Sequence, residues 1–222
     1  MKAAVIVFPG SNCDRDLSIA FEKVTGTKTK LIWHKYAVIP NAIDVIGIPG
    51  GFSFGDYLRV GAIAAQSPIC KALVDYVNSG GYVLGICNGF QILTETNILP
   101  GTLIRNQGLK YICSEIELSV ENNNTAFTHG YQNKQNIKLP IAHHDGNYFA
   151  DDDTVKTLND KDCIAFKYTK NPNGSICDIA GILSENKRVL GMMPHPERFN
   201  DQSLGGADGG LIFGAIDSML SQ

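Results

Sequence analysis

Continuous apolar runs predict strands in the first half of the chain. The first run, residues 2–8, is rich in Val and Ile and ends at Pro9-Gly10, which is typical of a strand covered on both faces. Similar runs follow, and each is closed by a polar residue or by glycines. They cover residues 29–33, 43–48 and 82–84. We therefore expect buried strands of the kind that form parallel sheets.

Stripes of apolar residues at helical spacing separate these runs. Positions 17, 20, 21 and 24 predict a helix that Ser11 or Asn12 caps and Gly26 ends. Ser67-Pro68 suits the N-cap and first residue of the next helix. A closing helix is expected over residues 211–219. Because strands and helices alternate, we predict an α/β fold with an open, mostly parallel, twisted sheet covered by helices on both faces (flavodoxin-like).

The pattern changes to irregular β-type segments at about residues 101–185, and we expect a small antiparallel excursion there. Solvated loops are expected at residues 121–124 and at the acidic residues 151–153, and a hairpin turn at residues 171–174. A short apolar strand over residues 188–193 returns the chain to the sheet. The 222 residues contain no internal repeat, so we expect a single domain over residues 1–222. Strand candidates within the excursion cover residues 112–120, 137–143 and 163–168.

Composition excludes several classes of protein. With 44% hydrophobic and 18% charged residues the chain is of ordinary globular type, and a net charge of −3 provides no surface for nucleic acid. No apolar run approaches the ~20 residues that span a bilayer. The first run has no signal-peptide features, so we expect a strand there. Six cysteines without C-x-x-C or zinc-finger spacing favour a reducing cytoplasm.

The first candidate for chemistry is Cys87, in Gly85-Ile86-Cys87-Asn88-Gly89. In a G-x-C-x-G pattern at a strand-to-helix turn, the residues two before and two after the cysteine nearly touch, which favours glycine. The turn exposes the thiol, and the helix start offers N–H groups and a dipole that favour a thiolate and can hold an oxyanion. Taken alone, these residues fit a buried structural cysteine equally well.

His195 and Glu197 follow the strand at residues 188–193 and are candidates for a base and its orienting group. In an extended segment residues i and i+2 point the same way, so the carboxylate can hold one ring nitrogen while the other faces the thiol. Alone, a His-x-Glu pair is more often a loop histidine beside a surface acid. Because the carboxyl ends of parallel strands share one edge, we nevertheless predict a triad of Cys87, His195 and Glu197.

The glycine-rich residues 50–61 begin where a strand ends. A flexible loop explains them structurally, whereas functionally the N–H of Gly51 or Phe52 can act with that of Asn88 as oxyanion donors. No Walker or dinucleotide-binding pattern occurs, so ATP and NAD are not expected on this chain.

Other polar residues are weaker candidates. Gln91, Arg105 and Asn106 are suitable for anchoring a small substrate, although such residues are more often solvated or structural. His143-His144-Asp145 does not suit a metal, because adjacent strand residues point to opposite faces. We therefore expect no metal site.

The chain resembles a class I (triad-type) glutamine amidotransferase in residues 50–61, 85–91 and 193–197. More narrowly, residues 49–59, 87–91, 105–106 and 140–143 resemble the glutaminase subunits of phosphoribosylformylglycinamidine synthase (PurQ type). The resemblance covers nearly the whole chain. It implies that L-glutamine is the substrate and that Gln91, Arg105, Asn106 and His143 bind it.

The resemblance also implies a mechanism and partners. Cys87 attacks the side-chain amide, His195 protonates the departing ammonia, and water releases glutamate from a γ-glutamyl thioester. No cofactor is implied on this chain; ATP and Mg belong to a large synthetase subunit (PurL type), accompanied by a small accessory subunit (PurS type), in de novo purine biosynthesis. Neither nucleic acid nor membrane is implied as a partner. The alternatives are a glutaminase of another pathway, a cysteine hydrolase or glyoxalase-like protein of similar fold, and a non-catalytic scaffold subunit.

Overall fold

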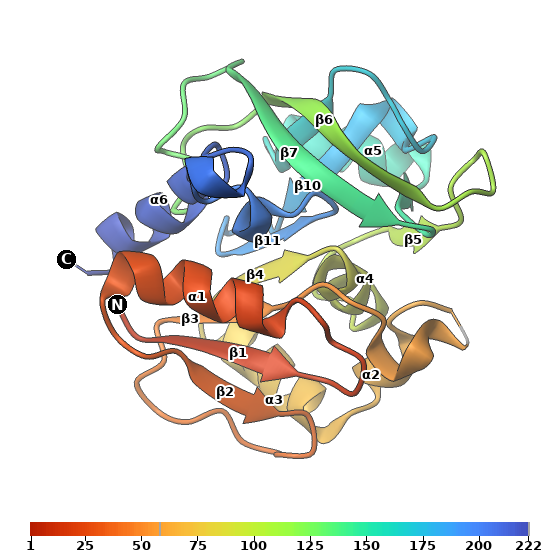
Figure 1. The fold of residues 1–222 in the computed structure, drawn as a ribbon. Coiled ribbons are helices and arrows are strands. Elements are labelled where there is room, and N and C mark those ends of the chain that lie inside the picture. The colour runs from red at the N-terminus through yellow and green to blue at the C-terminus, as the bar shows by residue number, and fades with distance from the viewer. Residues whose placement is uncertain (58, 222) are drawn as a thin grey trace.

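Most strands of the molecule join in one large sheet. The computed structural model describes residues 1–57 and 59–221, so Leu58 of the expected glycine-rich loop and Gln222 lie outside the described residues. Within that part of the chain, nine strands lie in the order β2-β1-β3-β4-β11-β10-β9-β6-β7, and β5 pairs with β8 in a second sheet (Figure 1). The strands are β1 (Ala3–Val7), β2 (Lys30–Trp33), β3 (Val45–Ile48), β4 (Tyr82–Ile86), β5 (Thr102–Ile104), β6 (Ile112–Val120), β7 (Asn136–His143), β8 (Asn147–Phe149), β9 (Ile164–Tyr168), β10 (Ile179–Leu183) and β11 (Val189–Met192).

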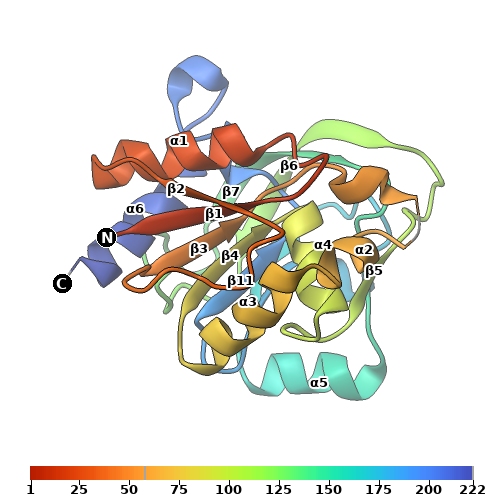
Figure 2. The same cartoon turned by 90° about the horizontal axis from the view of Figure 1, so that it is seen from below.

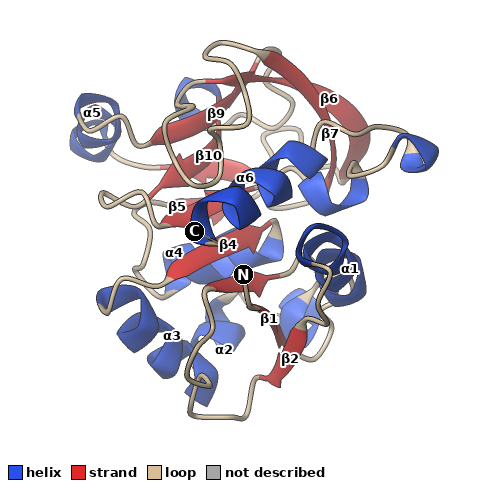
Figure 3. Cartoon of the chain, turned by 90° about the vertical axis from the view of Figure 1, so that its left-hand side faces the viewer, coloured by secondary structure: helices blue, strands red, loops and turns tan. Residues whose placement is uncertain are grey.

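One half of the large sheet is parallel and consists of β2, β1, β3, β4 and β11. All residues of β3 and β11 are buried, as the centre of a sheet covered on both faces requires. Helix α1, which packs against α6 through the edge-to-face rings of Phe21 and Phe213, lies on one face, and α3 and α4 lie on the other (Figures 2 and 3). The predicted α/β fold is confirmed. The helices are α1 (Asp14–Thr25), α2 (Ala62–Ala65), α3 (Pro68–Asn78), α4 (Asn88–Glu95), α5 (Asp152–Asp160) and α6 (Gly210–Leu220).

The other half of the sheet is antiparallel. β10 pairs with β11, β9 with β10, and β6 lies between β9 and β7. The expected antiparallel excursion is therefore present, but it extends the central sheet instead of standing apart from it. The expected hairpin turn at residues 171–174 lies between the antiparallel neighbours β9 and β10, in a longer connection that also holds the 3-10 helix η2 (Ile176–Asp178).

Two expectations about helix starts are wrong. Cys13 occupies the N-cap of α1, and Ser11 instead accepts a hydrogen bond from the N–H of Phe8 at 3.3 Å within the preceding turn. The acidic residues 151–153 begin a helix instead of forming a loop. Asp151 caps α5 by accepting from the N–H of Thr154 at 2.8 Å, and its acidic neighbours in the first turn suit the positive end of the helix dipole.

The edge formed by the carboxyl ends of the parallel strands is where the site lies. The segments that leave β1, β3, β4 and β11 there are residues 8–13, 49–56, 87–88 and 193–198. None of the described helices combines the length and apolar composition needed to cross a membrane.

Candidate active site

Cys87 lies at the sharp corner between β4 and α4. Its φ and ψ of 51° and −105° are unusual for a residue with a side chain, and its N–H donates to the carbonyl of Met192 at 2.8 Å. A Cβ on Gly85 would lie 2.9 Å from the carbonyl carbon of Gly89, and a Cβ on Gly89 would lie 2.1 Å from the carbonyl oxygen of Ile48. The expected close approach of the two glycines is therefore present, and the corner has the form of a nucleophile elbow.

The strand beside β4 brings His195 and Glu197 to the same corner. β11 pairs with β4 up to Met192 opposite Ile86, so the residues that follow the two strands are neighbours. Nδ1 of His195 lies 2.6 Å from Oε1 of Glu197, and both side chains are buried. We expected this segment to be extended, but residues Pro196–Arg198 form the 3-10 helix η3. This tight turn brings the carboxylate to the ring.

The electrostatics of His195 favour its charged form. Burial alone would lower its pKa, but the Glu197 carboxylate, and after it Cys87, raise the pKa well above the usual value. Nε2 is buried without a hydrogen-bond partner among the described residues, so it is free to interact with a substrate or with Cys87. Burial, followed by the nearby charge of His195, lowers the pKa of His143 to about 4, so that ring is neutral near pH 7.

The glycine-rich segment after β3 packs directly against this pair. A Cβ on Gly50 would lie 2.6 Å from Cε1 of His195, so a side chain there would displace the ring. The N–H of Phe52 donates to the carbonyl of Gly10 at 3.0 Å and is occupied. The N–H groups of Gly51 and Asn88 make no hydrogen bond within the described part of the chain. Two of the three expected oxyanion donors are therefore free in this conformation.

The four residues expected to bind substrate belong to one polar network. Oδ1 of Asn106 lies 3.1 Å from Nδ1 of His143, and Nε2 of Gln91 donates to the carbonyl of Asp145 at 2.6 Å. Nε of Arg105 lies 2.9 Å from the carboxylate of Asp145, and the Arg105 side chain is 52% exposed. The other three side chains are buried. The network fixes residues 143–146. The residue before this segment, Ala142, lies next to the side chain of Cys87.

The contact between Cys87 and Ala142 joins the parallel and antiparallel halves of the sheet. Sγ of Cys87 lies 3.8 Å from the carbonyl oxygen of Ala142, at the end of β7. The N–H of His195 donates to the carbonyl of Pro140 on the same strand at 2.9 Å. The antiparallel half therefore supplies one wall of the site.

Two further residues belong to the site although their sequence context did not indicate it, Cys13 and Arg198. Cys13 is buried at the start of α1, and its Sγ accepts from Nη2 of Arg198 at 3.1 Å. Its Sγ also lies within 4.8 Å of a ring nitrogen of His195. The signal was its position just after β1, since all the parallel strands end at the edge that holds Cys87.

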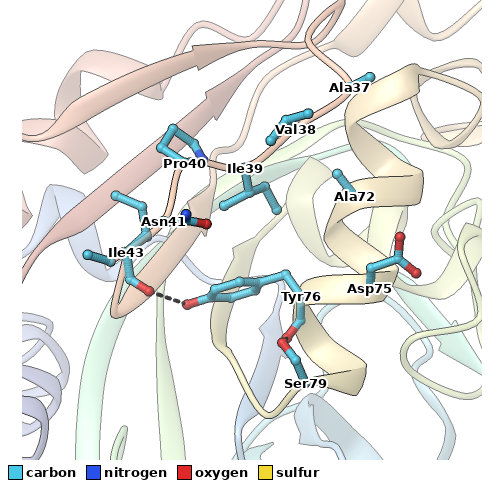
Figure 4. A pocket seen from close by; sticks show the side chains of 11 residues that line it. Ala37, Val38, Ile39, Pro40, Asn41, Ile43, Ala72, Asp75, Tyr76 and Ser79 are labelled. Atoms are coloured by element: carbon cyan, nitrogen blue, oxygen red, sulfur yellow. Dashed lines mark hydrogen bonds between the residues drawn. The ribbon is translucent and has the colours of Figure 1, made fainter.

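The cavity beside His195 is small. Its volume is about 60 Å³, well below the roughly 300 Å³ at which ligand pockets commonly begin. A larger hollow of about 430 Å³ lies between residues 37–43 and α3, where the Tyr76 hydroxyl donates to the carbonyl of Ile43 at 3.2 Å (Figure 4). No residue of the predicted triad lines that hollow. The small cavity is lined by Asn12, Cys13, Gly51, Phe52, Tyr111, Ala142, His195 and Arg198.

Comparisons with known proteins identify the family of the chain. The family model for the CobB/CobQ-like glutamine amidotransferase domain matches residues 1–205. The chain is 62% identical to phosphoribosylformylglycinamidine synthase subunit PurQ of Ruegeria sp. (strain TM1040), over 100% of this chain and 99% of that protein. It is 51% identical to the PurQ subunit of Zymomonas mobilis over 100% of both chains.

A solved structure agrees with these sequence matches. The structure of PurLQS from Thermotoga maritima contains a chain that superimposes with a TM-score of 0.89 at 40% identity, covering 99% of this chain and 98% of that one. The chain therefore belongs to the family of CobB/CobQ-like glutamine amidotransferase domains, alongside the PurQ subunits.

Proposed function

We propose that this chain is the glutaminase subunit of phosphoribosylformylglycinamidine synthase. It hydrolyses L-glutamine and passes the ammonia to an ATP-dependent synthetase subunit of the PurL type. The observation that carries the proposal is the buried pair of His195 and Glu197, 2.6 Å apart, beside a cysteine on a strained strand-to-helix corner. Relatives that are 51% to 62% identical over the whole chain carry the name of this subunit and support the choice of pathway.

In the first half of the reaction Cys87 is the nucleophile. Its sulfur forms a bond to the side-chain amide carbon of glutamine, and the oxyanion that develops accepts hydrogen bonds from the free N–H groups of Gly51 and Asn88. We assign the Phe52 N–H to holding the loop, because it already donates to Gly10. Protonated His195, whose pKa Glu197 helps to raise against burial, gives its proton to the leaving ammonia.

In the second half neutral His195 is the base. It takes a proton from water, which attacks the γ-glutamyl thioester and releases glutamate and the free thiol. Glu197 holds Nδ1 throughout, so Nε2 always faces the reaction. The same ring therefore serves as acid and then as base, while the carboxylate fixes its orientation.

The four expected glutamine-binding residues divide into two groups. Gln91, Asn106 and His143 are buried and bonded within the chain, so we assign them to shaping the wall around residues 143–146. Arg105 is half exposed and is our candidate for binding the α-carboxylate of glutamine. To do so it would give up its ion pair with Asp145. No cofactor is assigned to this chain, and ATP and Mg are assigned to the synthetase subunit. We propose an accessory subunit of the PurS type as a further partner. The proposed location is the cytoplasm.

The decisive experiment is covalent labelling with a glutamine-mimicking diazoketone in the presence of the synthetase subunit. Peptide mass mapping should find one adduct, on Cys87, because only this thiol lies on the elbow beside the histidine that protonates a leaving group. Glutamine hydrolysis should fall by roughly 10³-fold or more in Cys87→Ala. An adduct on another cysteine, or none, contradicts the proposal.

Cys113→Ala is the matched control, because Cys113 is an exposed thiol on β6. It should label and hydrolyse glutamine like the unchanged protein. The experiment also separates the alternatives. A scaffold subunit would give neither adduct nor ammonia, and a different cysteine hydrolase would give no ammonia from glutamine.

A further inference from the structure

Asp56, in the glycine-rich segment after β3, has a carboxylate oxygen that the described chain leaves unsatisfied. Its Oδ1 is buried and has no hydrogen-bond partner among the described residues. Burial, followed by the nearby charge of Asp145, raises the pKa of the Asp56 carboxyl to about 6. A buried carboxylate without a counter-charge costs stability, and groups of this kind are common where a protein binds a ligand. The mechanism proposed above gives Asp56 no part.

The segment that carries Asp56 is anchored to α4, the helix that follows Cys87. The N–H of Ser53 donates to Oδ1 of Asn88 at 3.2 Å, and a Cβ on Gly61 would lie 3.0 Å from the carbonyl carbon of Gln91. Between these two contacts Asp56 has a φ of 53°, which is costly for a residue with a side chain. The contacts with α4 therefore hold Asp56 over the first turn of this helix.

A chain of hydrogen bonds leads from the same turn of α4 to Asp145. Nδ2 of Asn88 donates to Oε1 of Gln91 at 2.9 Å, and Nε2 of Gln91 donates to the carbonyl of Asp145 at 2.6 Å. The Asp145 carboxylate pairs with Arg105 at 2.9 Å, and its charge also acts on Asp56. One guanidinium and two carboxylates are therefore grouped near Gln91.

We propose that the carboxylate of Asp56 binds the α-ammonium group of L-glutamine, while Arg105 binds its α-carboxylate. The inference rests on the proposed function and specifies how the charged end of that substrate is recognised. A free amino acid carries both charges side by side, and the two side chains match them. The reacting amide lies at the N–H of Asn88, and the two methylene groups of glutamine carry the charged end from there toward Gln91. When Arg105 leaves Asp145, this second carboxylate also attracts the ammonium group.

The charged end of glutamine lies outside the small cavity. Neither Asp56 nor Arg105 lines the cavity of about 60 Å³ beside His195. The two regions join when glutamine binds, because Arg105 then exchanges Asp145 for the substrate. A ligand without an α-amino group leaves the Asp56 carboxylate buried and unpaired, so the site discriminates against it.

Binding without reaction tests the proposal. Calorimetry on the Cys87→Ala chain with its synthetase subunit gives the Kd of L-glutamine and of glutaramate, the analogue in which hydrogen replaces the α-amino group. Adding Asp56→Asn should raise the Kd of L-glutamine by roughly tenfold or more and leave that of glutaramate within about twofold. Asn has nearly the same size as Asp and tolerates positive φ. Asp75→Asn is the matched control, because Asp75 is exposed on α3 and lines the separate hollow there, and it should change neither Kd.

Two binding results would overturn the proposal: an unchanged Kd of L-glutamine in Asp56→Asn, or equal increases for the two ligands. The first is also expected if Asp56 pairs with a cation of the synthetase subunit, and that subunit would then bind Asp56→Asn more weakly. The midpoint of urea unfolding of the free chain should be equal or higher in Asp56→Asn, because the buried charge is gone. A lower midpoint would reveal a structural partner of Asp56 and would also overturn the proposal.

Failure of the proposed function has a different signature. Absence of glutamine hydrolysis by the chain with an intact Cys87 would overturn that function, whereas the difference in Kd between the two ligands would still stand. With hydrolysis present, Asp56→Asn should raise KM for glutamine by roughly tenfold or more and change kcat by less than about threefold, because the charged end does not react.

Discussion

At the scale of residues, the central feature is the backbone of Cys87. A φ of 51° is costly for an L-residue, of order 1–3 kcal/mol, and the surrounding packing has to supply that energy. Its N–H bond to Met192 and the contact of Gly89 with Ile48 fix both sides of the corner. The result is a backbone corner that fixes the direction of the Cα–Cβ bond of Cys87 relative to β4 and α4.

Glu197→Gln tests the role of the carboxylate. The neutral amide keeps the hydrogen-bonding shape but not the charge that raises the pKa of His195, so this pKa should fall. If the imidazolium is the acid, the basic limb of the pH profile of kcat/KM should move to lower pH, and kcat should fall by roughly 10²-fold or more. Steady-state glutamine hydrolysis from pH 6 to 10 measures both.

Glu185→Gln is the control for this substitution, because Glu185 is an exposed surface residue paired with Lys161. It should leave the profile unchanged. A basic limb that stays in place or moves to higher pH in Glu197→Gln would contradict the role assigned to the carboxylate.

At the scale of elements, the junction of β4 and α4 depends on glycine. A Cβ on Gly89 would lie 2.1 Å from the backbone oxygen of Ile48, which cannot move without shifting β3. Gly89→Ala should therefore lower the free energy of unfolding by about 3 kcal/mol, at the upper end of the cost of overpacking. Urea denaturation followed by circular dichroism measures the loss.

Gly108→Ala provides the matched control. A Cβ on Gly108 meets no atom within 4 Å, so the free energy of unfolding should change by no more than about 0.5 kcal/mol. Equal losses in the two variants would show that the tight contact at Gly89 does not determine the stability of the corner.

The sequence predicts those elements whose signal is local. β6 was expected over the residues it occupies, and the start of α3 at Pro68 was expected from Ser67-Pro68. Helix α5 was missed because only Val155 and Leu158 are buried in it, which is too few for a clear apolar stripe. The continuation of the sheet through β10, β9, β6 and β7 depends on pairing between distant segments, which periodicity does not encode.

The candidate site shows the same division. The meeting of Cys87 with His195 was predicted, because it follows from the shared edge of parallel strands. The approach of Glu197 was predicted for the wrong reason, since a 3-10 turn and not strand alternation delivers it. Cys13 was missed because its importance comes from contacts with two distant segments, through Gly50 and Arg198.

At the scale of the whole molecule, the small cavity implies low activity for the chain alone. About 60 Å³ does not hold a glutamine, so the entrance has to widen. Two large side chains that line it are exposed, Phe52 at 43% and Tyr111 at 48%. We expect the synthetase subunit to cover these residues and to favour the open form.

Adding the synthetase subunit with its nucleotide and acceptor should therefore raise the rate of glutamine hydrolysis at least tenfold, as measured by glutamate release. Tyr111→Ser should reduce this stimulation, and Tyr36→Ser should not, because Tyr111 lines the cavity whereas Tyr36 is exposed but does not line it. Equal rates with and without the partner would contradict this coupling.

The ladder between β4 and β11 determines which part of the site can move when the entrance widens. Gly85 and Ile86 are hydrogen-bonded neighbours of Gly191 and Met192, and Cys87 extends this ladder by one further bond. Cys87 and His195 therefore follow directly from two hydrogen-bonded strands in the middle of the sheet, β4 and β11. The glycine-rich segment after β3 lies outside this ladder and carries an oxyanion donor, so we expect a hinge motion there. A partner that bends this segment would assemble or dismantle the oxyanion site while the distance between thiol and imidazole stays constant.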